Sequence, residues 1–396
     1  MVREGKLHIP KECMVLAIGS NSIECSVQIV AALPTCTKNE IDFQCKLIET
    51  LSNDIVEMTG APFLNWATDG DATRRQIFDK LMCWRLNESS SLFGIISRLK
   101  LIDCNVGRYE ETVNYDPKHL AKRLRNTLIG TLHFGNEHLV TASDMTEILS
   151  CHPNNSSDST KSMINPEGKQ NVAIATEMLM QFCDSVEDVS LLKRVSFRVC
   201  NVSSELHLLR YVIEGVLAMY CKIDLSIKEA LEAISTAAHV LFVLQRTLIK
   251  FIPNQLYHDL QATFEDAFYC ANKWQIAHAN EPFFLMLLGN DPIERAFGNI
   301  RLKYRHCSVD NLELINASRA MEYSSKILSK HSEWTGGKRA IMRRLALDYC
   351  NPRNLNAQNQ ILLGVDIIGT WNVGRANAEK VLNKFERFGG NNCDFF

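Results

Sequence analysis

The hydrophobic pattern changes its period along the chain. Two apolar runs within residues 13–34 are separated by the polar letters GSNS, which predicts two adjacent strands joined by a tight turn. Residues 39–60 place apolar side chains at helical spacing, and Gly60 and Pro62 indicate where that helix ends. The same reasoning predicts strands at 63–68 and 111–115 and helices at 73–84 and 116–128. The expected order is β-β-α-β-α-β-α.

The pattern beyond residue 128 is mostly helical. Residues 151–165, CHPNNSSDSTKSMIN, are polar and aperiodic and mark the clearest domain boundary, and further helices are expected at 290–306 and 374–388. We therefore expect an α/β (α+β) fold with five parts: a core segment at 1–150, a polar linker at 151–165, an all-α domain at 166–288, final core helices at 289–335 and a basic, Asn-rich tail at 336–396.

Composition narrows the classes of function. The 396 residues carry a formal net charge of −2, so any contact with nucleic acid must use local basic faces. The 14 cysteines form no CxxC pair, which argues against a zinc finger or a redox motif. The N-terminus does not resemble a signal peptide, and no apolar run is long enough to span a membrane. We expect an intracellular protein of a reducing compartment, nuclear or cytoplasmic.

The stretch NWATDGDATRRQIFDKL contains two close acids, Asp69 and Asp71, directly after a predicted strand. An acid at the carboxyl end of a strand in an α/β fold faces a crevice, which makes Asp69 a candidate metal ligand. The alternative is a DG turn in which Asp71 caps the following helix. Both interpretations hold together if Asp71 is the cap and Asp69 the ligand.

Glu294 presents a similar choice. DPIE is the pattern of a capping box, in which Asp291 caps the helix and Glu294 reaches back to the Asp291 N–H. Glu294 also shares a helix face with Gly298, Arg301 and Arg305. Two guanidinium groups beside a carboxylate suit a phosphodiester close to a metal ion, so Arg301 and Arg305 are candidate DNA contacts.

The predicted helix at 116–128 is basic. Lys118, Lys122 and Arg125 share one face, which is either simply solvated or a set of phosphate contacts with DNA. Asp116 is a candidate N-cap at the start of this helix. The roles of Asp116 and of the neighbouring His119 stay open at this point.

Three segments together resemble the P-element-like superfamily of cut-and-paste transposases, and most of all fungal transposon-derived chains of that kind. They are ATDGDATRR at 67–75, YDPKHLAKRLRNTL at 115–128 and LLGNDPIERAFGNIRLK at 287–303. The resemblance covers most of the chain, from about residue 5 to about residue 385. It implies DNA as a partner, and homo-oligomers are common among such transposases.

The resemblance implies a ribonuclease H-like core, with an incomplete mixed sheet interrupted by a large all-α insertion. It implies catalytic carboxylates that hold two Mg²⁺ or Mn²⁺ ions for phosphodiester cleavage and strand transfer. Asp69 matches the second carboxylate and Glu294 the third, whereas Asp116 matches a recurring aspartate of unassigned role. Relatives bind GTP through the insertion, although the sequence has no phosphate-loop motif.

The departure from the family pattern concerns the first carboxylate. It belongs to an opening strand that would precede KLHIPKECMVLAIG, and no residue here matches it. We therefore expect a truncated, degenerate or domesticated chain that lacks transposition activity alone. Glu12 or Glu24 is a substitute ligand in principle, but their local patterns do not favour it. The alternative is a non-enzymatic helical scaffold or interaction protein in which Asp69, Asp71, Asp116 and Glu294 are only helix caps.

Overall fold

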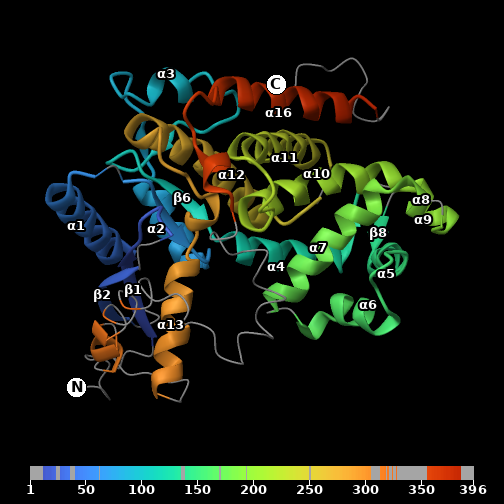
Figure 1. Ribbon diagram of the computed structural model, residues 1–396, viewed down its shortest axis with the longest axis horizontal. Helices are drawn as coiled ribbons and strands as arrows, with labels where there is room; N and C mark the ends of the chain where they lie inside the picture. Colours follow the sequence, from blue (N-terminus) through green and yellow to red (C-terminus); the bar gives the residue numbers. More distant parts are fainter. Residues whose placement is uncertain are drawn as a thin grey trace.

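A computed structural model describes residues 12–23, 27–35, 41–61, 63–134, 139–168, 171–192, 194–248, 251–304, 313–317, 319, 320, 323, 327 and 355–384. Its described part is a mixed α/β structure dominated by helices, with strands that pair two by two (Figure 1). No described helix combines the length and the apolar character needed to cross a bilayer.

The N-terminal strands form the expected pair, which is antiparallel, but the expected tight turn at GSNS is wrong, because the second strand begins only at Gln28, opposite Ile18. Strand β1 (Glu12–Ile18) pairs with β2 (Gln28–Thr35), with an irregularity between Leu16 and Ala17. One face of this hairpin packs against helix α13 (Asp291–Tyr304) through Ile300 and Phe297. Figure 1 shows α13 descending beside the hairpin. A helix near residue 300 is thereby brought close to the first strands of the chain.

The strand pair that positions the candidate site is parallel. Strand β3 (Asn65–Thr68) pairs with β6 (Thr112–Tyr115), with Thr68 opposite Tyr115. The carboxyl ends of both strands therefore lie at the same edge. Helix α1 (Ile41–Thr59) packs against α2 (Ala72–Leu81), which follows β3, and α4 (Pro117–Leu128) follows β6. These elements agree with the sequence expectation to within a few residues.

The small elements around this pair complete the α/β part. They are β4 (Trp84–Arg85), α3 (Phe93–Ile96), β5 (Asn105–Val106), β7 (Thr131–His133), β8 (Leu139–Thr141) and α5 (Ala142–Ser150). β4 pairs with β5 and β7 with β8, both antiparallel.

A helical block follows. Its helices are α7 (Val172–Glu187), α8 (Val189–Leu192), α9 (Phe197–Asn201), α10 (Ser203–Tyr220), α11 (Ile227–Thr247) and α12 (Asn254–His278). Helix α10 packs against α7 and α11, whereas α12 packs against strand β6 and helix α4. One hydrophobic cluster runs from Cys45 to Leu382 and includes residues of both the α/β part and the helical block. Helix α12 therefore joins the block to the strands of the candidate site.

Two helices differ from the sequence expectation. The polar stretch at 151–165 contains helix α6 (Ser157–Ile164), which begins with a Ser156/Ser159 capping box and buries Met163. The helix expected at 374–388 instead extends over Ile367–Leu382 as α16. It packs along α11 (Figure 1), and Trp371 is only 1% exposed. The serines at 156–159 favour a loop in the sequence pattern, but serine is equally common as a helix cap. Helix α16 begins earlier than expected because Asp366 is its N-cap.

Candidate metal centre

The candidate centre lies where strands β3 and β6 end. Asp69 follows β3 and Asp116 follows β6, and the Asp116 N–H donates to the Thr68 carbonyl at 2.9 Å, which continues the parallel pairing. Gly70, between the two acids of the DGD sequence, has a φ of +73°, a conformation that favours glycine. The tight turn leaves Asp69 exposed at the strand edge.

Asp71 is the N-cap of α2, as the capping interpretation expects. Its carboxylate accepts from the Thr73 N–H at 2.8 Å and from the Arg74 N–H at 3.1 Å. These bonds satisfy N–H groups at the helix start that have no partner within the helix. The local role of Asp71 is therefore accounted for by helix capping.

Asp116 is a cap and is also buried. It accepts a long hydrogen bond from the Lys118 N–H at 3.4 Å, and the residue is only 1% exposed. The chain before α13 covers it closely, because a Cβ on Gly289 would lie 3.0 Å from Asp116 Oδ1 and 3.1 Å from Pro117 Cδ. A larger residue at 289 would push this segment away from the centre.

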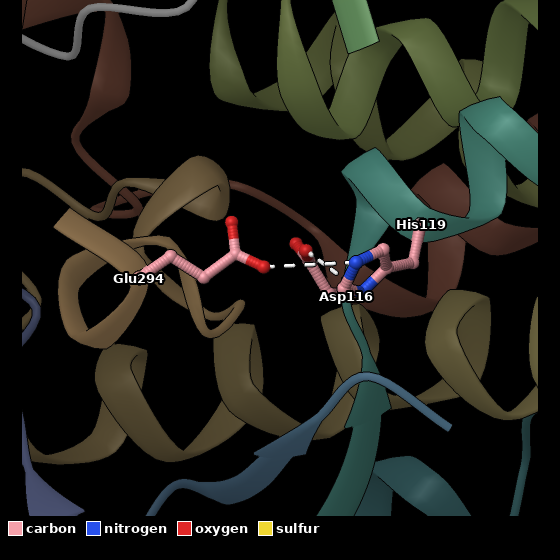
Figure 2. Close-up of side chains that lie close together, drawn as sticks. All are labelled: Asp116, His119 and Glu294. Carbon is pink, nitrogen blue, oxygen red and sulfur yellow. Dashed lines mark ion pairs between the residues drawn. The ribbon is translucent and has the colours of Figure 1, made fainter. Parts of the chain in front are cut away.

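Three side chains converge at this point (Figure 2). His119 Nδ1 lies 3.5 Å from Asp116 Oδ2, and His119 Nε2 lies 3.6 Å from Glu294 Oε1. One possible ligand atom from each residue lies within 4.8 Å of those of the other two. Asp116 and His119 belong to the start of α4, whereas Glu294 belongs to the first turn of α13. Residues far apart in sequence are thus brought together where α13 meets the start of α4.

Burial shifts the pKa values of Asp116 and His119 in opposite directions. Burial, reinforced by the nearby Glu294 carboxylate, raises the pKa of Asp116 to about 7. Burial and then the Lys122 charge lower the pKa of His119, whereas Glu294 and Asp69 act to raise it. Asp69 is therefore an electrostatic neighbour of His119, although it is not one of the three converging residues.

The donor set fits a small divalent cation. Asp116 Oδ2 and His119 Nδ1 are both buried and face each other at 3.5 Å, and neither has a hydrogen-bond partner among the described residues. Buried polar atoms normally have partners, so a cation bound by this pair would satisfy both atoms. Two carboxylates suit Mg²⁺ or Mn²⁺, and an imidazole nitrogen favours the transition metal.

Two of the residues expected to contact DNA, Lys118 and Arg125, are engaged in contacts within the protein. Arg125 is completely buried and donates to the carbonyls of Met163, Asn165 and Gly168, so the expectation that it contacts phosphate is wrong. The periodic pattern could not distinguish a buried guanidinium from a solvated one. Lys118 forms an ion pair with Asp291 and lies 5.7 Å from the centre of the Tyr220 ring.

The other residues expected to contact DNA are Lys122, Arg301 and Arg305. Lys122 is partly buried beside the centre. Arg301 lies in α13, and Arg305 lies outside the described residues. Of the two substitute ligands weighed above, Glu12 begins strand β1 and Glu24 lies outside the described residues.

Sequence reasoning missed two contributors to the centre. Asp291, expected only as a cap, pairs with Lys118 and so links α13 to α4. Asp259 of α12 binds Arg75 and Arg123 directly behind the strand ends. A buried stripe of polar residues along α12 was the available signal, but its partners are distant in sequence and no pattern identifies them.

No family model matches the chain, and no curated protein matches it. A solved structure that is similar is the Drosophila P element transposase strand transfer complex, with a TM-score of 0.53 and 14% sequence identity. The match covers 78% of this chain and 68% of that one. At this identity the similarity concerns the fold alone.

Proposed function

We propose that this chain is a transposase-derived protein with a ribonuclease H-like core that binds DNA and holds a divalent cation at Asp116, His119 and Glu294. The convergence of these three residues carries the proposal. Asp116 lies at a parallel strand end and Glu294 on a helix from a remote part of the sequence. The antiparallel β1–β2 hairpin followed by the parallel β3–β6 pair supports a core of this class.

Each residue has a role that follows from its surroundings. The Glu294 and Asp116 carboxylates supply negative charge, and the Glu294 charge adds to burial in raising the pKa of Asp116, an effect that a bound cation would oppose. A neutral His119 supplies a nitrogen lone pair. We propose that Asp69, which is exposed at the same strand edge, binds a second cation or faces the phosphate. A divalent cation there would polarise a phosphodiester oxygen and activate water.

DNA is the proposed substrate class. The solved relative is a strand transfer complex, and the present chain has a basic residue, Lys122, beside the centre. With a net charge of −2, the chain must bind DNA through such local contacts. We propose that the chain lacks strand transfer alone because no residue matches the first carboxylate of the family pattern. GTP is not part of the proposal.

Metal titration tests the proposal most directly. Mn²⁺ is titrated into the wild type and the Glu294→Gln variant, and binding is followed by electron paramagnetic resonance of the free ion. We expect one tight site in the wild type and an affinity loss of about 10-fold or more in Glu294→Gln, because a charged ligand is removed. The matched control is Asp71→Asn, whose side chain caps α2 and should leave Mn²⁺ affinity unchanged.

Equal, weak binding by all three proteins would remove the metal site and leave the helical scaffold as the better interpretation. The same preparations can be mixed with labelled duplex DNA and Mg²⁺. We expect DNA binding without cleavage or strand transfer. Efficient strand transfer by the wild type alone would contradict the proposal that the catalytic set is incomplete.

A further inference from the structure

Helix α12 carries a buried polar face directed at the strand pair. Asp259, Thr263 and Asp266 are 0% exposed, and Lys273 is 6% exposed. Asp266 accepts from Asn65 and Asn114 at 2.8 Å each, and Lys273 donates to the carbonyls of residues 63 and 64. A helix of the helical block therefore holds β3 and β6 by side-chain hydrogen bonds as well as by apolar packing.

Asp259 is the member of this face nearest to the candidate centre. Its carboxylate accepts two hydrogen bonds from Arg75, from Nε at 2.9 Å and from Nη2 at 2.7 Å. It also accepts from Arg123. Arg75 belongs to α2, which follows Asp69, and Arg123 belongs to α4, one turn beyond His119. One buried carboxylate therefore ties together the two helices that begin at the strand ends.

The Asp259 carboxylate also lies directly behind the strand ends. A Cβ added to Gly70 would lie 3.3 Å from Asp259 Oδ2 and 3.0 Å from the Tyr115 ring. Thr263, one turn along α12, accepts from the Tyr115 N–H at 3.0 Å. Gly70 and Tyr115 are the sequence neighbours of Asp69 and Asp116. Movement of Asp259 would therefore be transmitted to both strand-end acids.

The ion pairs of Asp259 with Arg75 and Arg123 make the contact between α12 and the strand ends rigid. Burial acts to raise the pKa of Asp259, but the hydrogen bonds from Arg75 and Arg123 and the nearby His258 side chain outweigh it and lower that pKa to about 2. The carboxylate is thus ionised throughout the neutral range. A bidentate guanidinium contact fixes both distance and orientation, which a single hydrogen bond does not.

We propose that Asp259 of α12 is a positioning residue for the metal centre: it holds Arg75 and Arg123 and thereby fixes the strand ends that carry Asp69 and Asp116. The inference rests on the proposed function for its metal readout. It assigns the helical block a role in the geometry of the centre. Groups that orient metal ligands commonly change metal affinity about 10- to 100-fold when removed.

The test compares three variants with the wild type. Asp259→Asn removes the charge, whereas Arg123→Gln removes the more exposed arginine and leaves the Arg75 contact, so that it should fold if Asp259→Asn does not. The control is Arg210→Gln in α10, where a similarly buried arginine pairs with Glu187 and Glu214. Mn²⁺ affinity and backbone hydrogen exchange without metal are measured well below each melting temperature.

We expect Asp259→Asn to weaken Mn²⁺ binding about 10-fold and Arg123→Gln less, with faster exchange in peptides covering residues 68–72 and 115–119. Arg210→Gln should change neither quantity. Unchanged affinity in both Asp259→Asn and Arg123→Gln, or an equal loss in Arg210→Gln, would overturn the inference.

The experiment also distinguishes failure of the positioning role from failure of the proposed metal centre. If the wild type binds no Mn²⁺, the metal centre is excluded, and hydrogen exchange alone decides the positioning role. Faster exchange at the strand ends in Asp259→Asn but not in Arg210→Gln supports that role without a metal. Equal exchange in both variants overturns it.

Discussion

Asp116 and Asp259 are two buried aspartates close to the same strand ends, and their pKa values shift in opposite directions. Burial, with the Glu294 charge adding to it, raises the pKa of Asp116 to about 7. Burial also acts to raise the pKa of Asp259, but its hydrogen bonds with Arg75 and Arg123 lower that pKa to about 2. The cationic partners of Asp259 therefore reverse the direction that burial alone would give. The surroundings of Asp116 therefore favour binding of an added cation, whereas Asp259 is already paired with Arg75 and Arg123.

The Asp259 shift predicts a loss of stability in acid. Because its folded pKa is below the ordinary value of 3.8, its ionised form stabilises the protein above about pH 4. That contribution, about 2 kcal/mol, is lost as the pH falls from about 4 to about 2. Urea unfolding of wild type and Asp259→Asn across this range should show a flatter pH dependence in the variant. Identical slopes would contradict the assignment.

Arg125 should matter for stability and not for DNA. Arg125→Met removes donors from the carbonyls of Met163 and Asn165, leaving buried acceptors unsatisfied, and should cost about 1–3 kcal/mol in the free energy of unfolding. The salt dependence of DNA binding should stay unchanged, whereas Lys122→Met should reduce its slope by about 1. A reduced slope in Arg125→Met would restore Arg125 as a DNA contact.

At the scale of elements, helix α13 is held in place by an ion pair. Lys118 of α4 and Asp291 of α13 form this pair, each with a side chain only 12% exposed. It lies beside the contact between His119 and Glu294. Because the two groups are largely removed from water, their pairing should be stronger than that of a surface salt bridge.

A double-mutant cycle measures this pairing. Lys118→Met and Asp291→Asn are made singly and together, and the free energy of unfolding is measured for each. We expect the losses of unfolding free energy in the two single variants to sum to at least about 1 kcal/mol more than the loss in the double variant. Either single change leaves the other charge without its partner. Additive losses would show that the two side chains do not depend on each other.

Much of the element order could be predicted from sequence, because the strands and helices around the strand ends have clear periods and caps. Asp69 and Asp116 follow strands, and Glu294 opens a helix, so each position had a local signal. The grouping of Glu294 with Asp116 and His119 had none, since it depends on how α13 packs. The burial of Arg125 and the partners of Asp259 likewise depend on tertiary contacts that periodicity does not encode.

At the scale of the whole molecule, a single hydrophobic cluster links the α/β part to the helical block. Trp371 of α16 belongs to this cluster, and its indole N–H donates to the Lys100 carbonyl at 3.0 Å. Its ring packs edge-on against Phe268, with 4.7 Å between the ring centroids. Lys100 lies between α3 and β5, whereas Phe268 lies on α12. A late helix therefore stabilises segments from both parts of the chain.

Trp371→Ala should lower the stability of both parts together. The change removes a large buried side chain and should cost about 3–5 kcal/mol. Urea unfolding is followed by far-ultraviolet circular dichroism for the helices and by tryptophan fluorescence, to which Trp66 of β3 contributes. With one shared core, both transitions should shift to lower urea and stay coincident.

The control is Val373→Ala on the same helix, where the side chain is 42% exposed and the midpoints should hardly move. A shift of the circular dichroism transition alone would mean that the helical block unfolds independently of the strands, and the role of α12 as their connection would then have to rest on its polar contacts only.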